Sequence, residues 1–433
     1  MEIENKILEQ CEDAKIASME LASVKTDIKD KALAEIANAI KRDKGKILAA
    51  NKKDLDNAGK ASLSDALLKR LKLDSVKLDE VIAGIKSVAR LEDPVGKALS
   101  ITELDKGLTL HKVTVPIGVI GVIFESRPDA LVQIASLCLK SGNAVILKGG
   151  SEAENTNNVL LDIMKKASEK YLAKGWIQLI ETREEVKEIL KMDEFIDLLI
   201  PRGSNKFVKY IKDNTKIPVL GHSEGICHVY VDKDADLKMA VDISFDAKCQ
   251  YPAVCNAMET LLVHKAIAKR FLPLMEKKFR EADVELRGCS ETQKILKNIK
   301  EATEEDWKTE YNDLVLSIKI VKDADEAIAH INKYGSHHTD AIVTENKETR
   351  DKFLDLVDSS SVMANCSTRF ADGFRYGLGA EVGISTNKLH ARGPVGLEGL
   401  VIYKYKLFGK GHIAAKYTGK KARKFAHRVI KQC

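Results

Sequence analysis

The sequence is poor in cysteine, in aromatic residues and in long apolar runs. Its 433 residues include 8 cysteines and 5% aromatic residues. A disulfide framework would need roughly 8–10% cysteine in a short secreted chain, so the core must come from apolar burial. No uncharged apolar run reaches the ~18 residues of a membrane span, and the longest candidate, Ala130 to Leu147, is broken by Lys140. The N-terminal sequence MEIENKILEQCEDAK lacks the apolar stretch of a secretory signal, so we expect a cytoplasmic protein with no membrane partner.

Common metal and nucleotide motifs are also missing. The sequence holds no GxxxxGK[ST] loop, no HExxH and no cysteine pair at zinc spacing. His337 and His338 are adjacent, so their side chains point in different directions on a regular element. The string GxGxxA at Gly409 to Ala414 has no strand–helix–strand unit around it, and we interpret it as chance. We therefore predict no metal site.

Basic residues are concentrated at the C-terminus. The net charge is only +6, yet no acidic residue follows Glu398, and ten Lys or Arg lie between Lys404 and Cys433. Such a tail can bind nucleic acid, which would predict salt-dependent retention on DNA. Apolar residues such as Leu407 and Phe425 alternate with the charges, so we favour a structural or subunit contact and no nucleic-acid partner.

Helical and strand patterns divide the chain. Residues 1–92 have helical periodicity, and residues 101–117 alternate around an Asp-Lys-Gly turn, as a hairpin does. From residue 115 to 231 short apolar strands alternate with helices, which predicts right-handed βαβ units in a parallel sheet covered on both faces. The expected strands are residues 118–124, 144–147, 177–180, 196–200 and 217–220, and a capping box at Ser151–Glu154 is expected to begin a helix.

Two Gly-Ser turns follow predicted strands and precede helices. They are Lys148-Gly149-Gly150-Ser151 and Pro201-Arg202-Gly203-Ser204. Helix N-termini at the carboxyl edge of a parallel sheet present free N–H groups to phosphate. Each turn alone fits a plain helix cap equally well, but the pair favours a phosphorylated cofactor.

Cys255 differs from the other cysteines in its surroundings. It lies in a loop, Lys248 to Ala257, that enters a predicted buried strand at residues 259–264. A loop cysteine beside polar donors can be partly ionised, and the thiolate is the form that attacks carbonyl carbon. Cys138 and Cys227 lie in apolar elements and are interpreted as core residues.

Four segments resemble the gamma-glutamyl phosphate reductases, also called glutamate-5-semialdehyde dehydrogenases, of the aldehyde dehydrogenase superfamily. They are VPIGVIGVIFESRPDALVQIASLCLKSGNAVILKGGS, CQYPAVCNAMETLLVH, STRFADGFRYGLGAEVGIS and KLHARGPVGLEGL. The resemblance implies an α/β fold with two Rossmann-like parallel-sheet domains and a β-hairpin oligomerisation element. The implied cofactor domain spans 1–99 and 118–221 with part of 360–392, the catalytic domain spans 222–359, and the oligomerisation element spans 100–117 and 393–433.

The resemblance also implies the reaction. Cys255 would attack the γ-acyl carbon of L-glutamyl 5-phosphate, release phosphate, and form a thioester that NADPH reduces to L-glutamate 5-semialdehyde, the second step of proline biosynthesis. The oxyanion would be held by the Cys255 backbone N–H and by Asn256 or Ser126. A hydrolytic or coenzyme A-acylating aldehyde dehydrogenase using the same thiol is the alternative enzyme.

Cofactor residues follow from the same resemblance. Lys148 matches the lysine of the superfamily's KxxE segment and Ser151 replaces its acid, which would remove repulsion of a 2′-phosphate and favour NADPH over NADH. Gly203 and Ser204 fall at the helix that meets the cofactor. Glu310 falls where a glutamate holds the nicotinamide ribose.

Substrate residues are assigned by the charge of the substrate. Arginine recognises planar anions, so Arg127, Arg369 and Arg392 are candidates for phosphate and carboxylate, and Glu125 for the ammonium. His222 occupies the place of the glutamate that activates water in hydrolytic relatives, although a shifted alignment would put Glu224 there. The resemblance implies a homo-oligomer and leaves open a transient association with glutamate 5-kinase.

Overall fold

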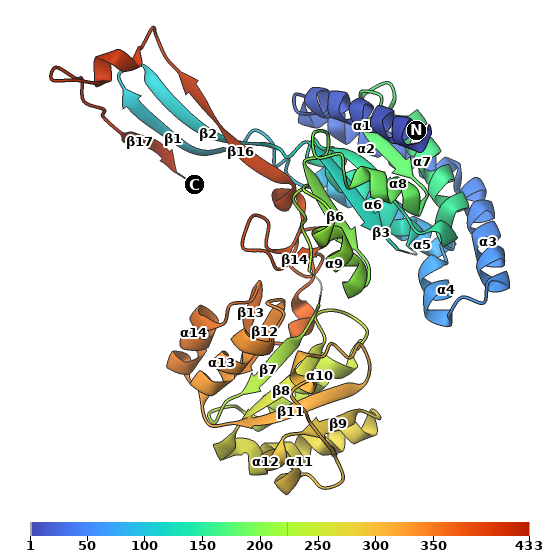
Figure 1. Ribbon diagram of the computed structural model, residues 1–433, viewed down its shortest axis with the longest axis vertical. Helices are drawn as coiled ribbons and strands as arrows, with labels where there is room; N and C mark the ends of the chain where they lie inside the picture. Colours follow the sequence, from blue (N-terminus) through green and yellow to red (C-terminus); the bar gives the residue numbers. More distant parts are fainter. Residues whose placement is uncertain (1, 126, 223, 433) are drawn as a thin grey trace.

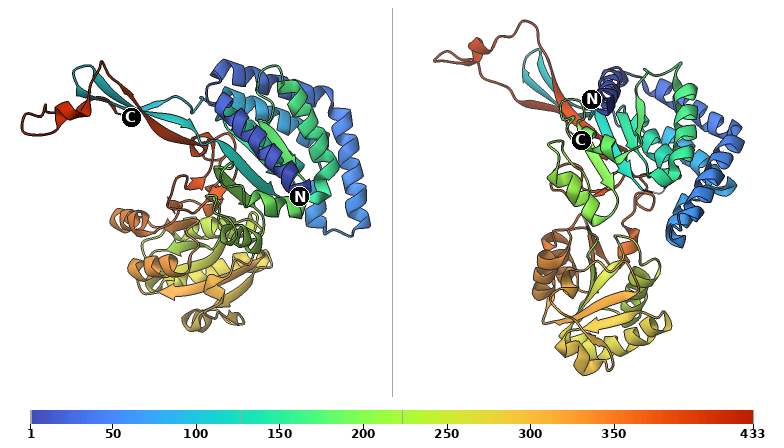
Figure 2. Two further views of the ribbon diagram at one scale, coloured as in Figure 1. Left: turned by 45° about the horizontal axis from the view of Figure 1, so that its top comes forward. Right: turned by 45° about the vertical axis from the view of Figure 1, so that its right-hand side comes forward.

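The computed structural model describes residues 2–125, 127–222 and 224–432. It contains two α/β lobes and an extended antiparallel arm that projects from the upper lobe (Figures 1 and 2). The predicted α/β class is therefore confirmed. No helix in the described ranges is long and apolar enough to cross a membrane.

The N-terminal lobe is built on a parallel sheet of order β5-β4-β3-β6. All side chains of β3 are buried, as expected for a strand covered on both faces. The strands are β3 (Val119–Phe124), β4 (Ala144–Lys148), β5 (Ile177–Ile180) and β6 (Leu198–Arg202). The helices are α1 (Glu2–Leu21), α2 (Thr26–Arg42), α3 (Lys44–Lys60), α4 (Asp65–Leu71), α5 (Ser75–Arg90), α6 (Pro128–Lys140), α7 (Glu154–Ser168), α8 (Arg183–Ile189) and α9 (Asn205–Asp213).

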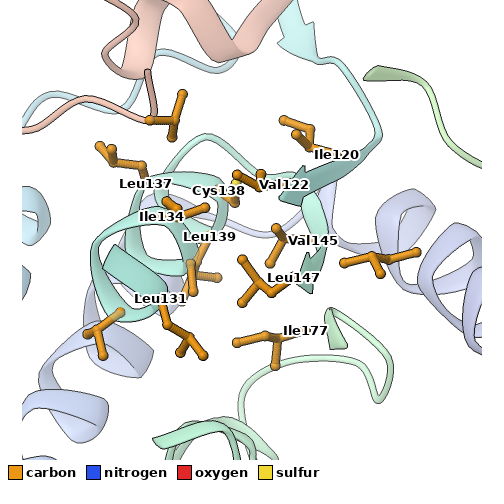
Figure 3. Close-up of a cluster of buried hydrophobic side chains, with 14 of the residues drawn as sticks. Ile120, Val122, Leu131, Ile134, Leu137, Cys138, Leu139, Val145, Leu147 and Ile177 are labelled. Atoms are coloured by element: carbon orange, nitrogen blue, oxygen red, sulfur yellow. The ribbon is translucent and has the colours of Figure 1, made fainter. Parts of the chain in front are cut away.

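Figure 3 shows how α6 packs against β3 and β4 in this lobe. Leu131, Ile134 and Cys138 of the helix point toward Val122 and Val145 of the strands. Pro128 begins the helix with its fixed φ, and Gly142 follows its end with a φ of +74°. The predicted helix and the core position of Cys138 are confirmed.

Two sequence predictions for this lobe are wrong in detail. Ser151–Ala153 forms the 3-10 helix η1, and no side-chain capping bond forms at its start or at the start of α7 within the described chain. Asp54 of α3 instead accepts hydrogen bonds from the backbone N–H of Asn155 (3.1 Å) and Thr156 (2.8 Å). The expected strand at 217–220 is reduced to a single bridge between Val219 and Leu199.

The second lobe, called the cysteine lobe here, holds a parallel sheet of order β10-β9-β11-β8-β7-β12-β13. Its strands are β7 (Cys227–Val231), β8 (Met258–His264), β9 (Glu285–Gly288), β10 (Lys300–Glu301), β11 (Val315–Val321), β12 (Thr339–Val343) and β13 (Ser361–Ala364). Its helices are α10 (Leu237–Cys249), α11 (Lys265–Glu281), α12 (Ser290–Ile295), α13 (Ala324–Tyr334) and α14 (Lys347–Leu356), with 3-10 helices η2 (Asp306–Lys308) and η3 (Thr368–Phe370).

The chain passes back to the N-terminal lobe after β13. Met363 and Ala371 pack in the core of the cysteine lobe, whereas Ala380, Val382 and Ala391 pack in the core of the N-terminal lobe. The short strands β14 (Ile384–Ser385) and β15 (Gly393–Pro394) and the 3-10 helix η4 (Leu397–Leu400) follow. The chain therefore crosses from one core to the other between Ala371 and Ala380.

The arm has the sheet order β16-β2-β1-β17. The predicted hairpin is confirmed as β1 (Ala98–Asp105) and β2 (Leu108–Pro116). The basic tail supplies β16 (Val401–Phe408), the 3-10 helix η5 (Ala414–Tyr417) and β17 (Arg428–Gln432). The tail is therefore a structural element, as its interleaved apolar residues predicted.

Candidate active site around Cys255

Cys255 lies in the irregular segment between α10 and β8. The backbone turns here through a bond from Ala257 N–H to the Val254 carbonyl (3.0 Å). The Cys227 thiol donates to the Cys255 carbonyl (3.1 Å), and Thr368 Oγ1 donates to the Asn256 carbonyl (2.7 Å). The first residue of β7 and the 3-10 helix η3, both in the cysteine lobe, thus fix the backbone on either side of the nucleophile candidate.

Gly225 makes this placement possible. A Cβ at this position would lie 2.6 Å from the Cys255 carbonyl carbon and closer still to its Cα and oxygen. The segment before β7 can therefore approach the cysteine backbone only because residue 225 has no side chain.

The sulfur of Cys255 faces two imidazoles. One ring nitrogen of His222, one of His338 and Cys255 Sγ all lie within 4.8 Å of one another. The two rings are edge to face, with centroids 4.8 Å apart. Glu224, the alternative to His222, is exposed. The structure therefore brings His222 to the thiol, and sequence reasoning missed His338, whose only signal was a neighbouring histidine.

The thiol is protonated in the free protein. Burial, aided by the negative charges of Glu310 and Glu381, raises the pKa of Cys255 to about 12. This shift opposes the expected ionisation of the loop cysteine, because the thiol is buried. Burial also lowers the pKa of His222, so that imidazole is neutral. Its Nδ1 lies 3.1 Å from the Ile384 carbonyl, which can only accept, so the lone pair is on Nε2.

Arg202 is a site residue that the sequence analysis quoted in a motif but did not assign. Its Nη1 is buried and has no hydrogen-bond partner among the described residues. Burial and the charge of Arg127 lower the pKa of Arg202, while the charge of Glu381 opposes this shift. The charge of Arg202 also acts on Cys255. An unpaired guanidinium beside the thiol is a ready partner for an anion.

The other predicted arginines differ in their partners. Arg369 is 9% exposed, its Nε donates to Gln250 Oε1 (2.9 Å), and its charge acts on Cys255. Arg127 pairs with Asp129 (3.1 Å) and remains half exposed. Arg392 pairs with Asp358 (3.1 Å) in a surface group. The geometry thus favours Arg369 over Arg392 as a site residue, because the Arg392 guanidinium already has a carboxylate partner.

Asn256 fastens the loop. Its Nδ2 donates to the Ala371 carbonyl (2.8 Å), and its Oδ1 is buried with no hydrogen-bond partner in the described chain. One amide hydrogen is therefore committed to a structural bond, which leaves the other for an oxyanion. Ser126, the alternative donor, lies outside the described residues.

The predicted cofactor residues fall at the carboxyl edge of the N-terminal sheet. Lys148 ends β4, where burial lowers its pKa while the charge of Glu152 opposes this shift and that of Arg183 adds to it. Ser151 lines a small pocket together with Gly149, Gly150 and residues 179–181. Arg183 is a second cation that sequence reasoning did not assign.

The second Gly-Ser turn leads to α9. Ser204 is the N-cap of this helix, and within the described chain its side chain makes no capping bond. Asn205, in the first turn, donates to Glu310 Oε2 (3.2 Å), and Gly203 lies against Glu125. The structure therefore brings Gly203, Ser204, Glu310 and Glu125 together. By contrast Asp54 already occupies the N-terminus of α7, so α9 is the better anion site.

Comparison with known proteins agrees with this geometry. The sequence model of the aldehyde dehydrogenase family matches residues 4–293. Gamma-glutamyl phosphate reductase from Methanococcoides burtonii is 60% identical over 440 aligned residues, covering 99% of this chain and 97% of that protein. The enzyme of the same name from Acetivibrio thermocellus is 58% identical over 422 residues, covering 97% of each chain.

Solved structures give the same result. The crystal structure of gamma-glutamyl phosphate reductase from Thermotoga maritima superposes with a TM-score of 0.92 at 41% identity and covers 94% of this chain and 99% of that one. An acetylating aldehyde dehydrogenase from Geobacillus thermoglucosidasius, at 17% identity, superposes with a TM-score of 0.65 and covers 95% of this chain and 98% of that one. This second likeness shows the fold alone.

Proposed function

Because the chain belongs to the gamma-glutamyl phosphate reductases of the aldehyde dehydrogenase family, we propose that Cys255 is its nucleophile and NADPH its reductant. The enzyme reduces L-glutamyl 5-phosphate to L-glutamate 5-semialdehyde with release of phosphate, the second step of proline biosynthesis from glutamate. The observation that carries the proposal is that Cys255 lies beside the neutral imidazole of His222 and feels the charge of Arg202, whose buried Nη1 has no hydrogen-bond partner among the described residues.

His222 provides an acceptor for the thiol proton. Its neutral Nε2 takes that proton as the sulfur attacks the γ-acyl carbon. The carbon–oxygen bond to phosphate then breaks, and phosphate leaves as a stable anion while a thioester remains on Cys255. A nicotinamide held by the residues at the sheet edge would supply a hydride to the thioester carbon. The carbon–sulfur bond breaks, the sulfur regains its proton from His222, and the aldehyde departs.

Negative charge develops on the acyl oxygen in both steps. We assign its stabilisation to the Cys255 backbone N–H and to the free amide hydrogen of Asn256. The contacts from Gly225, Cys227 and Thr368 fix this segment before substrate binds, and such preorganisation is what makes donors effective.

Anion recognition falls to Arg202 and Arg369. Both guanidiniums act electrostatically on Cys255, and we assign the phosphate and the carboxylate of the substrate to them. Arg127 is close enough to Arg202 to lower its pKa and can complete the cluster. Glu125 and Glu381 are the carboxylates available to the substrate ammonium.

The residues at the sheet edge fit a dinucleotide. The first turn of α9, with Ser204 uncapped, suits the pyrophosphate, and Glu310 suits the nicotinamide ribose. Lys148 ends the strand before Ser151, and the charge of Arg183 acts on Lys148, so two cations are available to a 2′-phosphate. This supports NADPH over NADH.

The arm supports a homo-oligomer. Ile402, Tyr403, Tyr405, Leu407 and Phe408 of β16 are each at least 44% exposed. Apolar residues on both faces of one strand need a partner surface, and we propose a second copy of this chain. The small number of cysteines supports a cytoplasmic location. A transient association with glutamate 5-kinase would shorten the path of a labile acyl phosphate.

The test runs the reaction backward, because the acyl phosphate is labile. Glutamate semialdehyde and NADP⁺ should give NADPH when phosphate, or arsenate in its place, is present. When neither anion is added, the reaction should stop. Cys255→Ala should lower kcat by at least about 10³-fold while NADP⁺ binding survives. Cys249→Ser, in the same segment, is the matched control.

Two outcomes would overturn the proposal. Turnover that is indifferent to phosphate would favour a hydrolytic enzyme, and activity retained in Cys255→Ala would remove the nucleophile. Arg202→Lys tests anion recognition separately. We expect KM for phosphate to rise by roughly 10- to 100-fold, because a charged hydrogen bond contributes about 1.5–3 kcal/mol, whereas Arg127→Lys should have a smaller effect.

A further inference from the structure

The cluster of His222, Cys255 and His338 is more than the proposed reaction requires. We propose that these three side chains form a binding site for a soft divalent cation such as Zn²⁺, and that the bound ion blocks the nucleophile reversibly. The three donor atoms come from the segment before β7, the segment before β8 and the residue before β12, and they lie within 4.8 Å of one another. No two of them are close in sequence, so spacing rules could not find the site.

Both imidazoles are oriented as metal ligands usually are. A ligating histidine generally uses its second ring nitrogen to bond a carbonyl or another oxygen. His222 Nδ1 lies 3.1 Å from the Ile384 carbonyl, and His338 Nδ1 lies 2.9 Å from Thr339 Oγ1. His338 Nε2 is buried with no hydrogen-bond partner in the described part of the chain. Because Nδ1 of each ring is engaged in this way, we assign Nε2 of each ring to the metal ion.

The donor set selects the ion. Two imidazoles and one thiolate suit Zn²⁺, Co²⁺ or Cu⁺, whereas Mg²⁺ and Ca²⁺ need oxygen ligands. A tetrahedral zinc ion with bonds of about 2.0 Å to nitrogen and about 2.3 Å to sulfur separates its ligands by roughly 3.5 Å. The cluster therefore has to contract by about 1.3 Å at its widest, and the fourth position remains open for water.

Charges around the cluster both help and oppose binding. Glu310 and Glu381 place negative charge near the sulfur, and Arg202 places positive charge there. The Cys255 proton must leave when the metal–sulfur bond forms, so one proton is released to solvent for each ion bound, with no change of oxidation state. The sulfur lone pair is then committed to the metal and cannot attack an acyl carbon.

The expected block of turnover rests on the proposed function, whereas metal binding does not. The experiment uses chelator-treated full-length protein titrated with Co²⁺ as a spectroscopic probe. We expect one equivalent of Co²⁺ to give a thiolate-to-cobalt charge-transfer band and the visible bands of a tetrahedral ion. Zn²⁺ should displace Co²⁺, release one proton, and inhibit NADPH formation until a chelator is added.

Variants locate the site. Cys255→Ser and His338→Gln should weaken Zn²⁺ binding by more than the roughly 10- to 100-fold that follows loss of a supporting residue. His338→Cys keeps a metal-binding side chain at this position and should retain Zn²⁺ binding. It serves as the second test if His338→Gln folds poorly. Cys249→Ser and His330→Gln are matched controls, since His330 is also a buried histidine with an unpartnered Nε2 in the same lobe.

The outcomes separate the two proposals. A cobalt spectrum without the charge-transfer band, or Zn²⁺ affinity unchanged in Cys255→Ser and His338→Gln, overturns the metal site. A site that binds as expected while turnover continues at full rate leaves the metal site intact and overturns the assignment of Cys255 as nucleophile.

Discussion

Replacing Gly225 with alanine should slow catalysis by about 100-fold through the backbone of Cys255. The added Cβ would lie 2.6 Å from the Cys255 carbonyl carbon and closer still to its Cα and oxygen, whereas ordinary contacts begin at 3.4 Å, so the cysteine segment has to retreat by more than about 0.8 Å. A misplacement of about 1 Å can cost about 10²-fold in rate. At 1.36 kcal/mol for each factor of ten, this is about 2.7 kcal/mol of lost transition-state stabilisation.

The assay compares kcat for phosphate-dependent NADPH formation with two other measurements. Affinity for NADP⁺ should be unchanged, and the free energy of unfolding should fall by only about 1–3 kcal/mol, as for other overpacked sites. Gly221→Ala is the matched control, because its added Cβ would meet nothing closer than the Pro201 carbonyl at 3.6 Å. A wild-type kcat in Gly225→Ala, or an equal loss in Gly221→Ala, would refute the reasoning.

Three further predictions concern ionisation, the buried ion pair and the cap of α7. Because burial raises the pKa of Cys255 to about 12, the rate of its alkylation by iodoacetamide should rise about tenfold per pH unit from about pH 7 to about pH 10. A rate that reaches a plateau near pH 8 would show that a neighbouring group ionises the thiol in the free protein. Lys248→Met removes the cation that lies 2.6 Å from the buried Glu259 carboxylate, so the free energy of unfolding, measured by chemical denaturation, should fall by about 3–5 kcal/mol. The double variant Lys248→Met with Glu259→Leu should recover most of this loss. Lys238→Met, at an exposed position, is the control and should change the free energy of unfolding little. Asp54→Ala removes the acceptor for two N–H groups of α7 and should lower the free energy of unfolding by about 1–3 kcal/mol. Asp56→Ala, on the exposed face of α3, is the control and should not lower it. Equal effects of the two variants would show that the cap contributes little.

Local patterns predicted the scaffold well. Residues 177–180 form a strand where the apolar run placed one, and Pro128 and Gly142 mark the limits of α6 as start and stop residues do. The capping box at Ser151 failed for a tertiary reason: Asp54, about a hundred residues away in sequence, supplies the bonds that a local side chain was expected to make.

The sequence by itself determined which residue types are available: a loop cysteine, two Gly-Ser turns, and motifs that name the family. These depend on short-range periodicity, turn chemistry and residue identity, all of which can be seen along the chain. Only the tertiary structure decided that His222 and His338 face one sulfur, that Arg202 Nη1 is buried without a partner in the described chain, and that burial raises the pKa of the thiol. Those properties depend on burial and on charges brought together from distant segments, and no local pattern encodes them.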